Sequence, residues 1–328
     1  MLNNIITILE CSRIFSLPMS IMSWLVIFVY AIVQNGNPFY GLLCLIGLCF
    51  VHLGANMTDD YIDYKHLIKA VDFDKDEYMK NTQKTKCRYI LNGIIREKDL
   101  VIIAGSYFLV GLVIGLFLFA KCGIGILYFM LLGGLISVLY PLFSRICMAE
   151  VLLSIAFGPA LFGGVYYAMT KSIPNEIYIL SLPTMFIVLV LLYIHMVMDY
   201  DFDTNEGKLT IANRFNSQYD SLIVLKLLMI LAYCSVVLLC IFDIVNWQIF
   251  IVFLTIPMSV DLYKSMESFT CNPQSLPPHK WYHFPMENID RDSEKEETPF
   301  MIRMLQGRNL MIYFSVLMSI GILISITL

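Results

Sequence analysis

Long apolar runs alternate with short polar stretches along most of this chain. The apolar runs are about twenty residues long, which is the length that an α-helix needs to cross about 30 Å of hydrocarbon. Helices are the expected spanning elements, because they satisfy their own backbone hydrogen bonds in lipid. The pattern predicts about nine transmembrane helices, at residues 14–34, 39–58, 99–120, 123–143, 150–170, 176–198, 220–241, 246–264 and 309–327.

The composition also indicates an integral membrane protein. Of the 328 residues, 58% are hydrophobic and 15% are charged, whereas soluble domains are about half apolar and about one quarter charged. The formal net charge of −4 indicates neither an acidic nor a basic partner, and we expect no nucleic acid to bind. The N-terminus has no short apolar region followed by a cleavage site, so we expect no removable signal peptide. The nine cysteines form no CxxC pair and are expected to be reduced packing residues.

Lysine and arginine residues fall in alternate loops. Three long segments on one side, at about 59–98, 199–219 and 265–308, contain many of them, whereas the opposite side has Lys121 and Lys171. Positively charged loops stay in the cytoplasm. We therefore expect three cytoplasmic loops, the N-terminus inside and the C-terminus outside, in the inner membrane of a bacterium.

The predicted second and sixth spans are four helices apart, and each ends in an acidic cluster. This spacing suggests two parallel four-helix halves and a last helix around a central cavity, in one all-α membrane domain over residues 1–328. The third long segment is different, because four of its prolines precede a run of charged residues. We expect that segment to be a polar surface loop without a catalytic role.

The first acidic cluster follows the predicted second span. If that helix continues, Asn56, Asp60 and Asp63 lie at positions i, i+4 and i+7 and share one face. Asp59 lies one turn before Asp63. This face would present an amide and up to three carboxylates.

The second acidic cluster ends the predicted sixth span. His195, Asp199 and Asp203 are four residues apart and share a face, whereas Asp201 is rotated by about 200° from Asp199. Asp199 and Asp203 are therefore candidate metal ligands, and Asp201 is not. We expect His195, like His52 in the second span, to be a packed or hydrogen-bonded histidine, because no matching histidine pair is present.

Carboxylates at the C-terminal end of a helix need a compensating cation, because the helix dipole there is also negative. Magnesium suits this role, since it is held by one or two carboxylates together with substrate phosphates. Basic residues in the same loops could bind the remaining phosphate charge, and these are Lys86, Arg88, Lys208 and Arg214. A solvated membrane boundary would explain one such cluster equally well, but two clusters on one side, each followed by a basic loop, favour a magnesium-diphosphate site.

The residues of both clusters resemble the UbiA superfamily of membrane prenyltransferases, and within it the 1,4-dihydroxy-2-naphthoate polyprenyltransferases of menaquinone synthesis. The stretch from Ala55 to Lys65 is similar to ANxxNDYxDYK, with Asp59 in place of the usual asparagine. The stretch from Asp199 to Arg214 is similar to DxxxDxxxGKxTLAxR, which is the most specific match.

Two further matches lie between these stretches. The turn that begins at Arg88 resembles the family's RPLxSG without its proline, and Glu150 with the Phe157-Gly158-Pro159 sequence resembles the fifth helix of the naphthoate enzymes. The resemblance covers about residues 14–265. It implies metal binding by Asp60, Asp63, Asp199 and Asp203, and substrate binding by Asn56, Asp59, Arg88, Glu150, Lys208 and Arg214.

The resemblance also implies an activity. A polyprenyl diphosphate would bind through Mg²⁺, with its tail beside lipid, and the allylic cation would attack an electron-rich aromatic ring, with 1,4-dihydroxy-2-naphthoate as the expected acceptor. A carboxylate or the released diphosphate would then remove a proton. The alternatives are another acceptor, such as 4-hydroxybenzoate, and a carrier of ions or protons. Carriers generally place acidic residues near the bilayer midplane, whereas these lie at helix ends.

Overall fold

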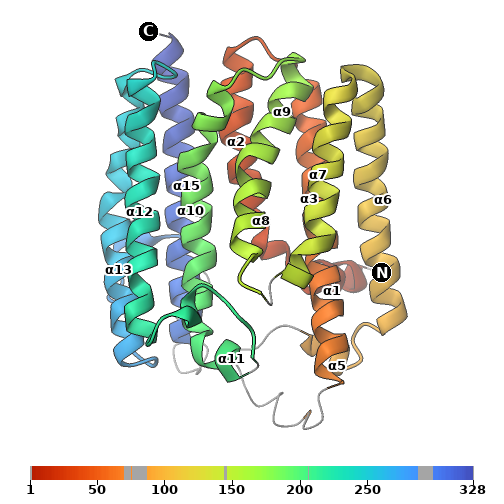
Figure 1. Cartoon of the computed structure of the whole chain (residues 1–328), viewed down its shortest axis with the longest axis vertical. Coiled ribbons are helices and arrows are strands. Elements are labelled where there is room, and N and C mark those ends of the chain that lie inside the picture. The colour runs from red at the N-terminus through yellow and green to blue at the C-terminus, as the bar shows by residue number, and fades with distance from the viewer. Residues whose placement is uncertain are drawn as a thin grey trace.

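The computed structural model describes residues 2–69, 75, 87–143, 146–205, 207–286 and 298–327. These residues are almost entirely helical, with one isolated bridge between Ile146 and Leu209 as their only strand-like pairing. Nine of the described helical segments are long and apolar enough to cross a membrane (Figure 1). The predicted all-α integral membrane fold is confirmed.

The N-terminal part of the chain supplies the first five spans. A short helix α1 (Leu2–Cys11) and a turn η1 (Ile14–Ser16) lead into the first of them. The helices that follow are α2 (Pro18–Val33), α3 (Pro38–Leu67), α5 (Arg88–Leu91), α6 (Glu97–Cys122), α7 (Ile124–Phe143), and α8 (Ala149–Ile155), which continues through η2 (Ala156–Ala160) into α9 (Leu161–Thr170).

The C-terminal part supplies the remaining spans. Its elements are α10 (Glu176–Met198), α11 (Tyr200–Asn205), η3 (Ala212–Arg214), α12 (Gln218–Ile241), η4 (Trp247–Thr255), which runs into α13 (Ile256–Cys271), then η5 (Trp281–His283) and α15 (Thr298–Thr327). Helix α10 is the most buried span of those described. The acidic residues that follow α10 are therefore attached to the most enclosed helix of the bundle.

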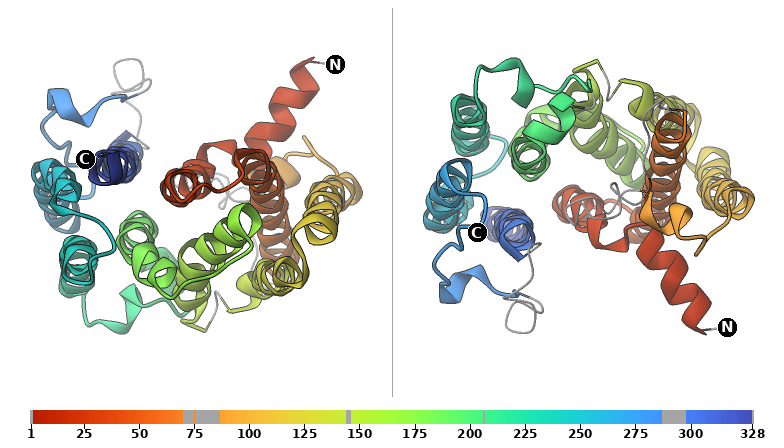
Figure 2. Two further views of the ribbon diagram at one scale, coloured as in Figure 1. Left: turned by 90° about the horizontal axis from the view of Figure 1, so that it is seen from above. Right: turned by 90° about the horizontal axis from the view of Figure 1, so that it is seen from below.

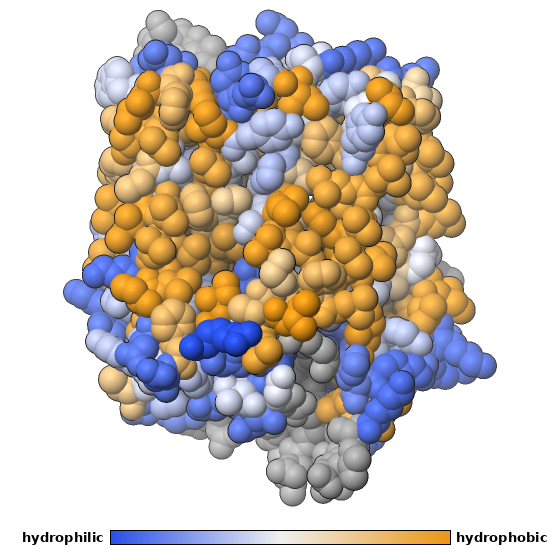
Figure 3. Space-filling view, in the orientation of Figure 1, coloured by the Kyte–Doolittle hydropathy of each residue, from blue (hydrophilic) through white to orange (hydrophobic). Residues whose placement is uncertain are grey.

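The spans form two groups when viewed along the bundle axis. Figure 2 shows α2, α3, α6, α7 and α9 on one side and α10, α12, α13 and α15 on the other. Helix α15 joins the two groups, because it packs against α2 as well as against η4 and α10. Large exposed apolar side chains, including Ile102, Leu109 and Val113 of α6, cover the flank of the bundle. Figure 3 shows the resulting hydrophobic band between two polar ends, as expected for a surface in contact with lipid.

One end of the bundle contains α5 and α11, and the C-terminus lies at the other end (Figure 1). We call the first of these the α11 end. The α11 end is also where α3 finishes, so both acidic clusters lie at the same end of the molecule. This arrangement agrees with the alternation of basic loops in the sequence.

Three helices extend further than their apolar runs predicted. Helix α3 continues to Leu67 and therefore contains the first acidic cluster, and α13 continues to Cys271. Helix α15 begins at Thr298, whereas the apolar pattern predicted a start at residue 309. The extra turns of α15 contain Arg303 and Gln306, which interrupt the apolar run but are buried against other parts of the protein. Hydropathy alone therefore underestimated the length of this helix.

The fifth span is bent at its centre. Gly158 has non-helical dihedral angles (φ −97°, ψ −110°), and Pro159 follows it inside the π-helical turn η2. Proline removes a backbone donor and clashes with the preceding turn, so it commonly bends a helix. A side chain at Gly158 would also approach Met185 of α10, since a Cβ atom would lie 3.0 Å from its sulfur. The bend thus coincides with close packing of α10.

Candidate active site

The first acidic cluster lies in the last turns of α3. Asp59 and Asp60 are almost fully buried, with 3% and 1% of their surfaces exposed, and Asp63 is half-buried. Burying an ionised carboxylate is unfavourable unless a cation or several donors compensate the charge. The end of α3 therefore requires a positive partner.

Arg13 supplies positive charge to this cluster. Its Nη1 atom lies 3.8 Å from Asp59 Oδ2, and its Nη2 atom forms an ion pair with Asp60 Oδ1. Arg13 adopts a left-handed conformation (φ 59°) between α1 and η1, which turns the chain just before the first span. The guanidinium thus contacts two carboxylates that neighbour each other on α3. Sequence reasoning did not identify Arg13, because its partners are more than forty residues away in the chain.

A polar network continues along the same helix from this cluster. The Asn56 amide donates to the Ser12 carbonyl at 3.1 Å and to Ser16 Oγ at 2.9 Å. Ser16 Oγ and Ser20 Oγ lie 3.0 Å and 2.6 Å from the two ring nitrogens of His52. His52 is therefore a hydrogen-bonded histidine, as the sequence suggested. The network fixes η1 and the start of α2 against α3, beside the buried carboxylates.

Helix α5 packs near the C-terminal end of α3. The Cys87 thiol donates to the Asp60 carbonyl at 3.2 Å, and Cys87 has a left-handed conformation (φ 62°) that starts the short helix at Arg88. The neighbouring Tyr89 is buried, and this burial raises the pKa of its hydroxyl. Arg88 is thus held close to the first acidic cluster in the fold. Lys86, the other basic residue predicted in this loop, lies outside the described residues.

The second acidic cluster spans the junction of α10 and α11. Asp199 follows the last residue of α10, and its carboxylate lies 3.1 Å from His195 Nδ1. The Asp203 amide donates to the Asp199 carbonyl at 2.8 Å. Asp203 is buried, with 3% of its surface exposed, whereas Asp201 is exposed. The backbone thus places Asp203 and Asp201 on different sides of α11, as the helical spacing suggested.

The loop after α11 returns a lysine to Asp203. The Lys208 amide donates to the Asp203 carbonyl at 2.9 Å, and Lys208 Nζ lies 3.5 Å from Asp203 Oδ1. Gly207 enables this return, because it adopts φ +64°, a conformation that other residues rarely take. The Asn213 amide donates to the Lys208 carbonyl at 2.6 Å, and Asn213 Oδ1 accepts from the Thr210 amide. The loop is therefore closed by its own side chains.

Glu150 and Arg214 help to hold this loop against the start of α8. The Cys147 amide donates to the Leu209 carbonyl at 2.9 Å, and Glu150 Oε1 accepts from the Ile211 amide at 3.4 Å. Glu150 is buried and lies at the start of α8, so it links the fifth span to the loop. Burial raises the pKa of the Cys147 thiol, and the Arg214 guanidinium opposes that rise through a hydrogen bond. Glu150 thus contacts the loop that contains Lys208, and Arg214 contacts Cys147, which is bonded to the same loop.

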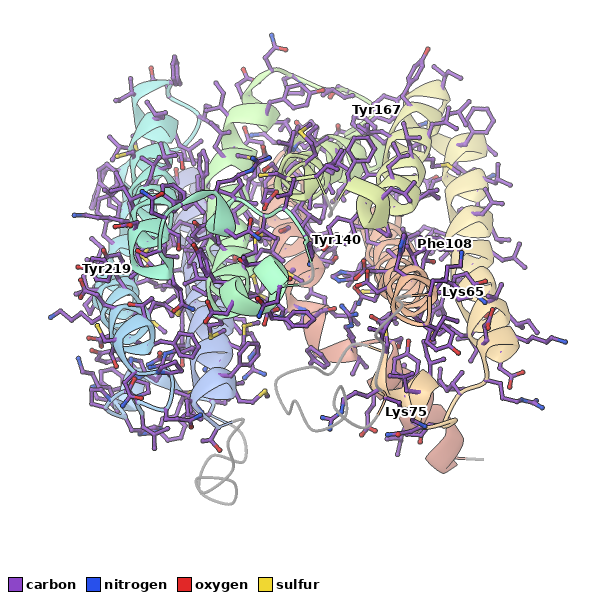
Figure 4. All side chains as sticks on the ribbon, turned by 60° about the horizontal axis from the view of Figure 1, so that its bottom comes forward. Lys65, Lys75, Phe108, Tyr140, Tyr167 and Tyr219 are labelled. Carbon is purple, nitrogen blue, oxygen red and sulfur yellow. The ribbon has the colours of Figure 1, made fainter. Side chains whose placement is uncertain are left out.

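The two clusters occupy the α11 end of the bundle from different sides. Figure 4, in which this end is turned toward the viewer, shows Lys65 of α3 on one side and α11 on the other. Within the described residues, no group of three or more His, Cys, Asp and Glu side chains converges closely enough to hold a metal by itself. The buried carboxylates nevertheless fit a hard divalent cation, because magnesium takes oxygen ligands and is usually completed by substrate phosphates.

A sequence model of the UbiA prenyltransferase family matches residues 20–274. The chain belongs to the UbiA prenyltransferase family. This match contains both acidic clusters and the loop with Lys208. A search of curated proteins found no match.

Solved structures share the UbiA fold with this chain. An apo UbiA homologue from Aeropyrum pernix K1 is 13% identical, with a TM-score of 0.57 over 93% of this chain and 98% of that one. A UbiA homologue from Archaeoglobus fulgidus bound to GPP and Mg²⁺ is 14% identical, with a TM-score of 0.54 over 95% and 99%. A digeranylgeranylglyceryl phosphate synthase is 16% identical, with a TM-score of 0.53 over 94% and 99%. At these identities, the comparison establishes the fold.

Proposed function

We propose that this protein transfers a polyprenyl group from a polyprenyl diphosphate to an aromatic acceptor in a Mg²⁺-dependent reaction. The observation that supports this proposal best is the presence of two carboxylate clusters at one end of a UbiA fold, each with a buried aspartate in contact with a cationic side chain. Solved UbiA homologues from Archaeoglobus fulgidus are described as bound to GPP and Mg²⁺ and to DMAPP and Mg²⁺. The proposal assigns the same class of substrate to this chain.

The four aspartates at the metal positions divide between the two clusters. Asp60 and Asp63 would bind Mg²⁺ from α3, and Asp199 and Asp203 from the α10–α11 junction. The bound metal would stabilise negative charge on the departing diphosphate. Lys208 is anchored at Asp203 and would add a charged donor to that diphosphate. Arg88 lies on α5 beside the first cluster, and Arg214 lies in η3 after the Lys208 loop. Both would bind the remaining phosphate oxygens.

Arg13 lies outside the recognised sequence motifs, and we assign it a role at the first acidic cluster. Its guanidinium contacts Asp59 and Asp60, so it competes with a metal ion for the first cluster. When Mg²⁺ and diphosphate enter, the same guanidinium would gain phosphate oxygens as partners. Arg13 would then keep the carboxylates compensated in the absence of substrate and bind anionic substrate in its presence.

We assign 1,4-dihydroxy-2-naphthoate as the acceptor, within menaquinone synthesis. This assignment is supported by the Gly207-Lys208-Leu209-Thr210 sequence and by the Phe157-Gly158-Pro159 bend, which resemble the naphthoate enzymes. The basic residues at the α11 end support an orientation with that end and the N-terminus in the cytoplasm. The C-terminus, at the opposite end of the bundle, would then lie outside.

The acceptor can be identified with purified protein in lipid vesicles. The assay offers a radiolabelled prenyl diphosphate with Mg²⁺ and either 1,4-dihydroxy-2-naphthoate or 4-hydroxybenzoate, and the products are separated by chromatography. A prenylated naphthoquinol supports the full proposal. Product with 4-hydroxybenzoate alone would retain the prenyltransferase and replace the acceptor. Absence of any diphosphate release would instead favour a carrier.

A further inference from the structure

A segment between the last two spans is fixed to the outside of the bundle, and it lies beyond the residues matched by the family, 20–274. We call residues 275–286 the strap. Figure 2 shows the part of the strap around η5 on the periphery, beyond α13 and α15. The sequence suggested a polar surface loop here. The structure shows that this peripheral strap is held by a partly buried ionic cluster.

Asp261 of α13 is the centre of that cluster. Lys280 Nζ donates to both carboxylate oxygens of Asp261, at 2.6 Å and 2.8 Å. The Tyr282 hydroxyl donates to the same carboxylate, and His283 Nε2 lies 3.4 Å from Asp261 Oδ2. An ionisable residue inside a span is costly unless it is paired and hydrogen-bonded. Lys280, Tyr282 and His283 of the strap together meet this requirement.

Helix α15 holds the strap from its other side. The Asn309 amide donates to the Pro285 carbonyl at 2.8 Å and to the His283 carbonyl, and the Tyr313 hydroxyl donates to the Phe284 carbonyl at 2.9 Å. At the base of the strap, buried Arg303 donates to Ser275 Oγ at 2.9 Å. The polar residues that interrupted the apolar run of α15 are therefore used to bind the strap.

These attachments place the strap beside the spans and not beyond their ends. Asp261 precedes the end of α13 by ten residues, which is about 15 Å along a helix, and Asn309 follows the start of α15 by eleven residues, or about 16 Å. Non-helical backbone at membrane depth is stable only if its polar groups are satisfied. The carbonyls of residues 283–285 have donors on α15, and Pro277, Pro278 and Pro285 have no amide hydrogen to satisfy.

The strap exposes three large apolar side chains. Trp281 exposes 82% of its surface, and Leu276 and Phe284 each expose about half. Val260 of α13, the neighbour of Asp261, is also exposed and belongs to the lipid-facing flank of the bundle. Tryptophan is enriched where a membrane meets water, because its ring is mostly apolar and its N–H is polar. The strap and the neighbouring helix α13 thus both expose apolar side chains that suit contact with lipid.

We propose that the strap is an interfacial membrane anchor, embedded in the leaflet at the α11 end with Trp281 and Phe284 in contact with lipid. Its inner face joins α13 to α15 through Asp261 and Asn309. This role is independent of the acceptor and of the proposed prenyl transfer. The partner surface is the bilayer itself, at the boundary between headgroups and acyl chains.

Tryptophan fluorescence of the full chain in nanodiscs tests the anchor. The chain has three tryptophans, and subtracting the spectrum of Trp281→Phe from that of the unaltered protein isolates the emission of Trp281. We expect this difference emission to be lost in lipid brominated near the glycerol end of its acyl chains and to resist aqueous iodide. Quenching by iodide without quenching by brominated lipid would overturn the proposal. Phe284→Trp in the Trp281→Phe background provides a second probe on the same face, with the same expected result.

A second measurement tests the attachment through Asp261. Asp261→Asn removes the charge that binds Lys280 and His283, so we expect iodide to reach Trp281 more readily in this variant. Glu267→Gln is the matched control, because it removes a carboxylate from the same helix without touching the strap cluster. Unchanged iodide access in Asp261→Asn would show that the cluster does not hold the strap, and this result would overturn that part of the proposal.

Discussion

Two buried aspartates, one on α3 and one on α11, are each paired with a positively charged side chain in the structure. Asp60 and Asp203 are each more than nine-tenths buried, and each has a cationic contact from outside its own helix, Arg13 and Lys208 respectively. A carboxylate in such a position remains ionised only while that charge is compensated. The residues that stabilise the site without substrate are therefore also those best placed to respond to Mg²⁺ and diphosphate.

Arg13→Gln should make the protein dependent on Mg²⁺ for stability. Removing one partner of a buried pair costs about 3 kcal/mol, since a charge remains uncompensated. A cation that binds the folded state offsets this loss. We expect a lower thermal midpoint in detergent without Mg²⁺ and substantial recovery with it, measured by the unfolding of the purified variant.

Arg96→Gln is the control for this experiment. Arg96 pairs with Asp99 at 2.8 Å on an exposed surface, and such a pair contributes only about 0 to 1 kcal/mol. Its variant should unfold like the unaltered protein at every Mg²⁺ concentration. An Arg13→Gln variant that behaves in the same way would contradict the assignment of Arg13 to the carboxylate cluster.

Lys208→Ala should weaken the binding of prenyl diphosphate. A lysine that binds substrate and transition state equally affects KM more than kcat. We expect KM for prenyl diphosphate to rise about tenfold with a smaller change in kcat, as the loss of one charged contact to phosphate implies. Lys226→Ala, which alters an exposed residue of α12, should leave both constants unchanged. Equal kinetics for the two variants would argue against a diphosphate role for Lys208.

At the scale of elements, short irregular segments position the functional side chains, and the long helices hold those segments. The loop from Gly207 to Asn213 is closed by its own hydrogen bonds and supported by Glu150. Arg13 is positioned by the turn between α1 and η1, and the strap by α13 and α15. Changes in these segments should therefore alter function or anchoring with little effect on the spans.

Gly207→Ala tests the backbone of the loop. No neighbouring atom would meet an added Cβ at Gly207, so the cost arises from the φ of +64° and amounts to about 1 kcal/mol. We expect a raised KM for prenyl diphosphate, because Lys208 would be displaced from Asp203. Gly105→Ala in α6 is the control, since Gly105 is helical and also has open space around it. That substitution should preserve kinetics, and a normal KM in Gly207→Ala would show that the loop tolerates the change.

The strap should be sensitive to acid through His283. Burial lowers the pKa of His283 below its ordinary value, against the opposing effect of Asp261. The unfolded chain then binds a proton at this residue more readily than the folded chain does. The free energy of unfolding is therefore unaffected by protonation of His283 above about pH 6.5 and declines as the pH falls below that value. We expect the thermal midpoint of the unaltered protein to fall more between pH 7 and pH 5 than that of His283→Gln. His279→Gln, which changes an exposed histidine, should retain the full decline.

For the whole molecule, the length of each apolar run was enough to predict the number of spans. It was sufficient because about twenty residues must cross the hydrocarbon in each helix. The pattern failed at the start of α15, since Arg303 and Gln306 are polar but buried by partners that lie elsewhere in the chain. Hydropathy depends on the residue type and not on its surroundings. It therefore does not predict polar helical turns that are buried by other parts of the protein.

The sequence predicted only those parts of the candidate site that depend on local helical spacing. Helical period alone places Asp60 with Asp63 and separates Asp201 from Asp203, because these relations are local. The contact between Arg13 and Asp60 depends on how α1, η1 and α3 pack, and no spacing in the sequence encodes it. Asn213 was likewise missed, although its position after Thr210 is typical of a side-chain-closed turn.

The most direct test of the central claim is the rate of prenyl transfer as a function of Mg²⁺ concentration for Asp60→Asn, Asp203→Asn and Asp201→Asn in lipid. We predict that EDTA abolishes transfer and that Asp60→Asn and Asp203→Asn each lose a factor of about 100 or more. Asp201→Asn, which changes an exposed carboxylate, should retain the activity and the Mg²⁺ dependence of the unaltered protein. Transfer that is insensitive to EDTA, or full activity in both buried-site variants, would contradict the account.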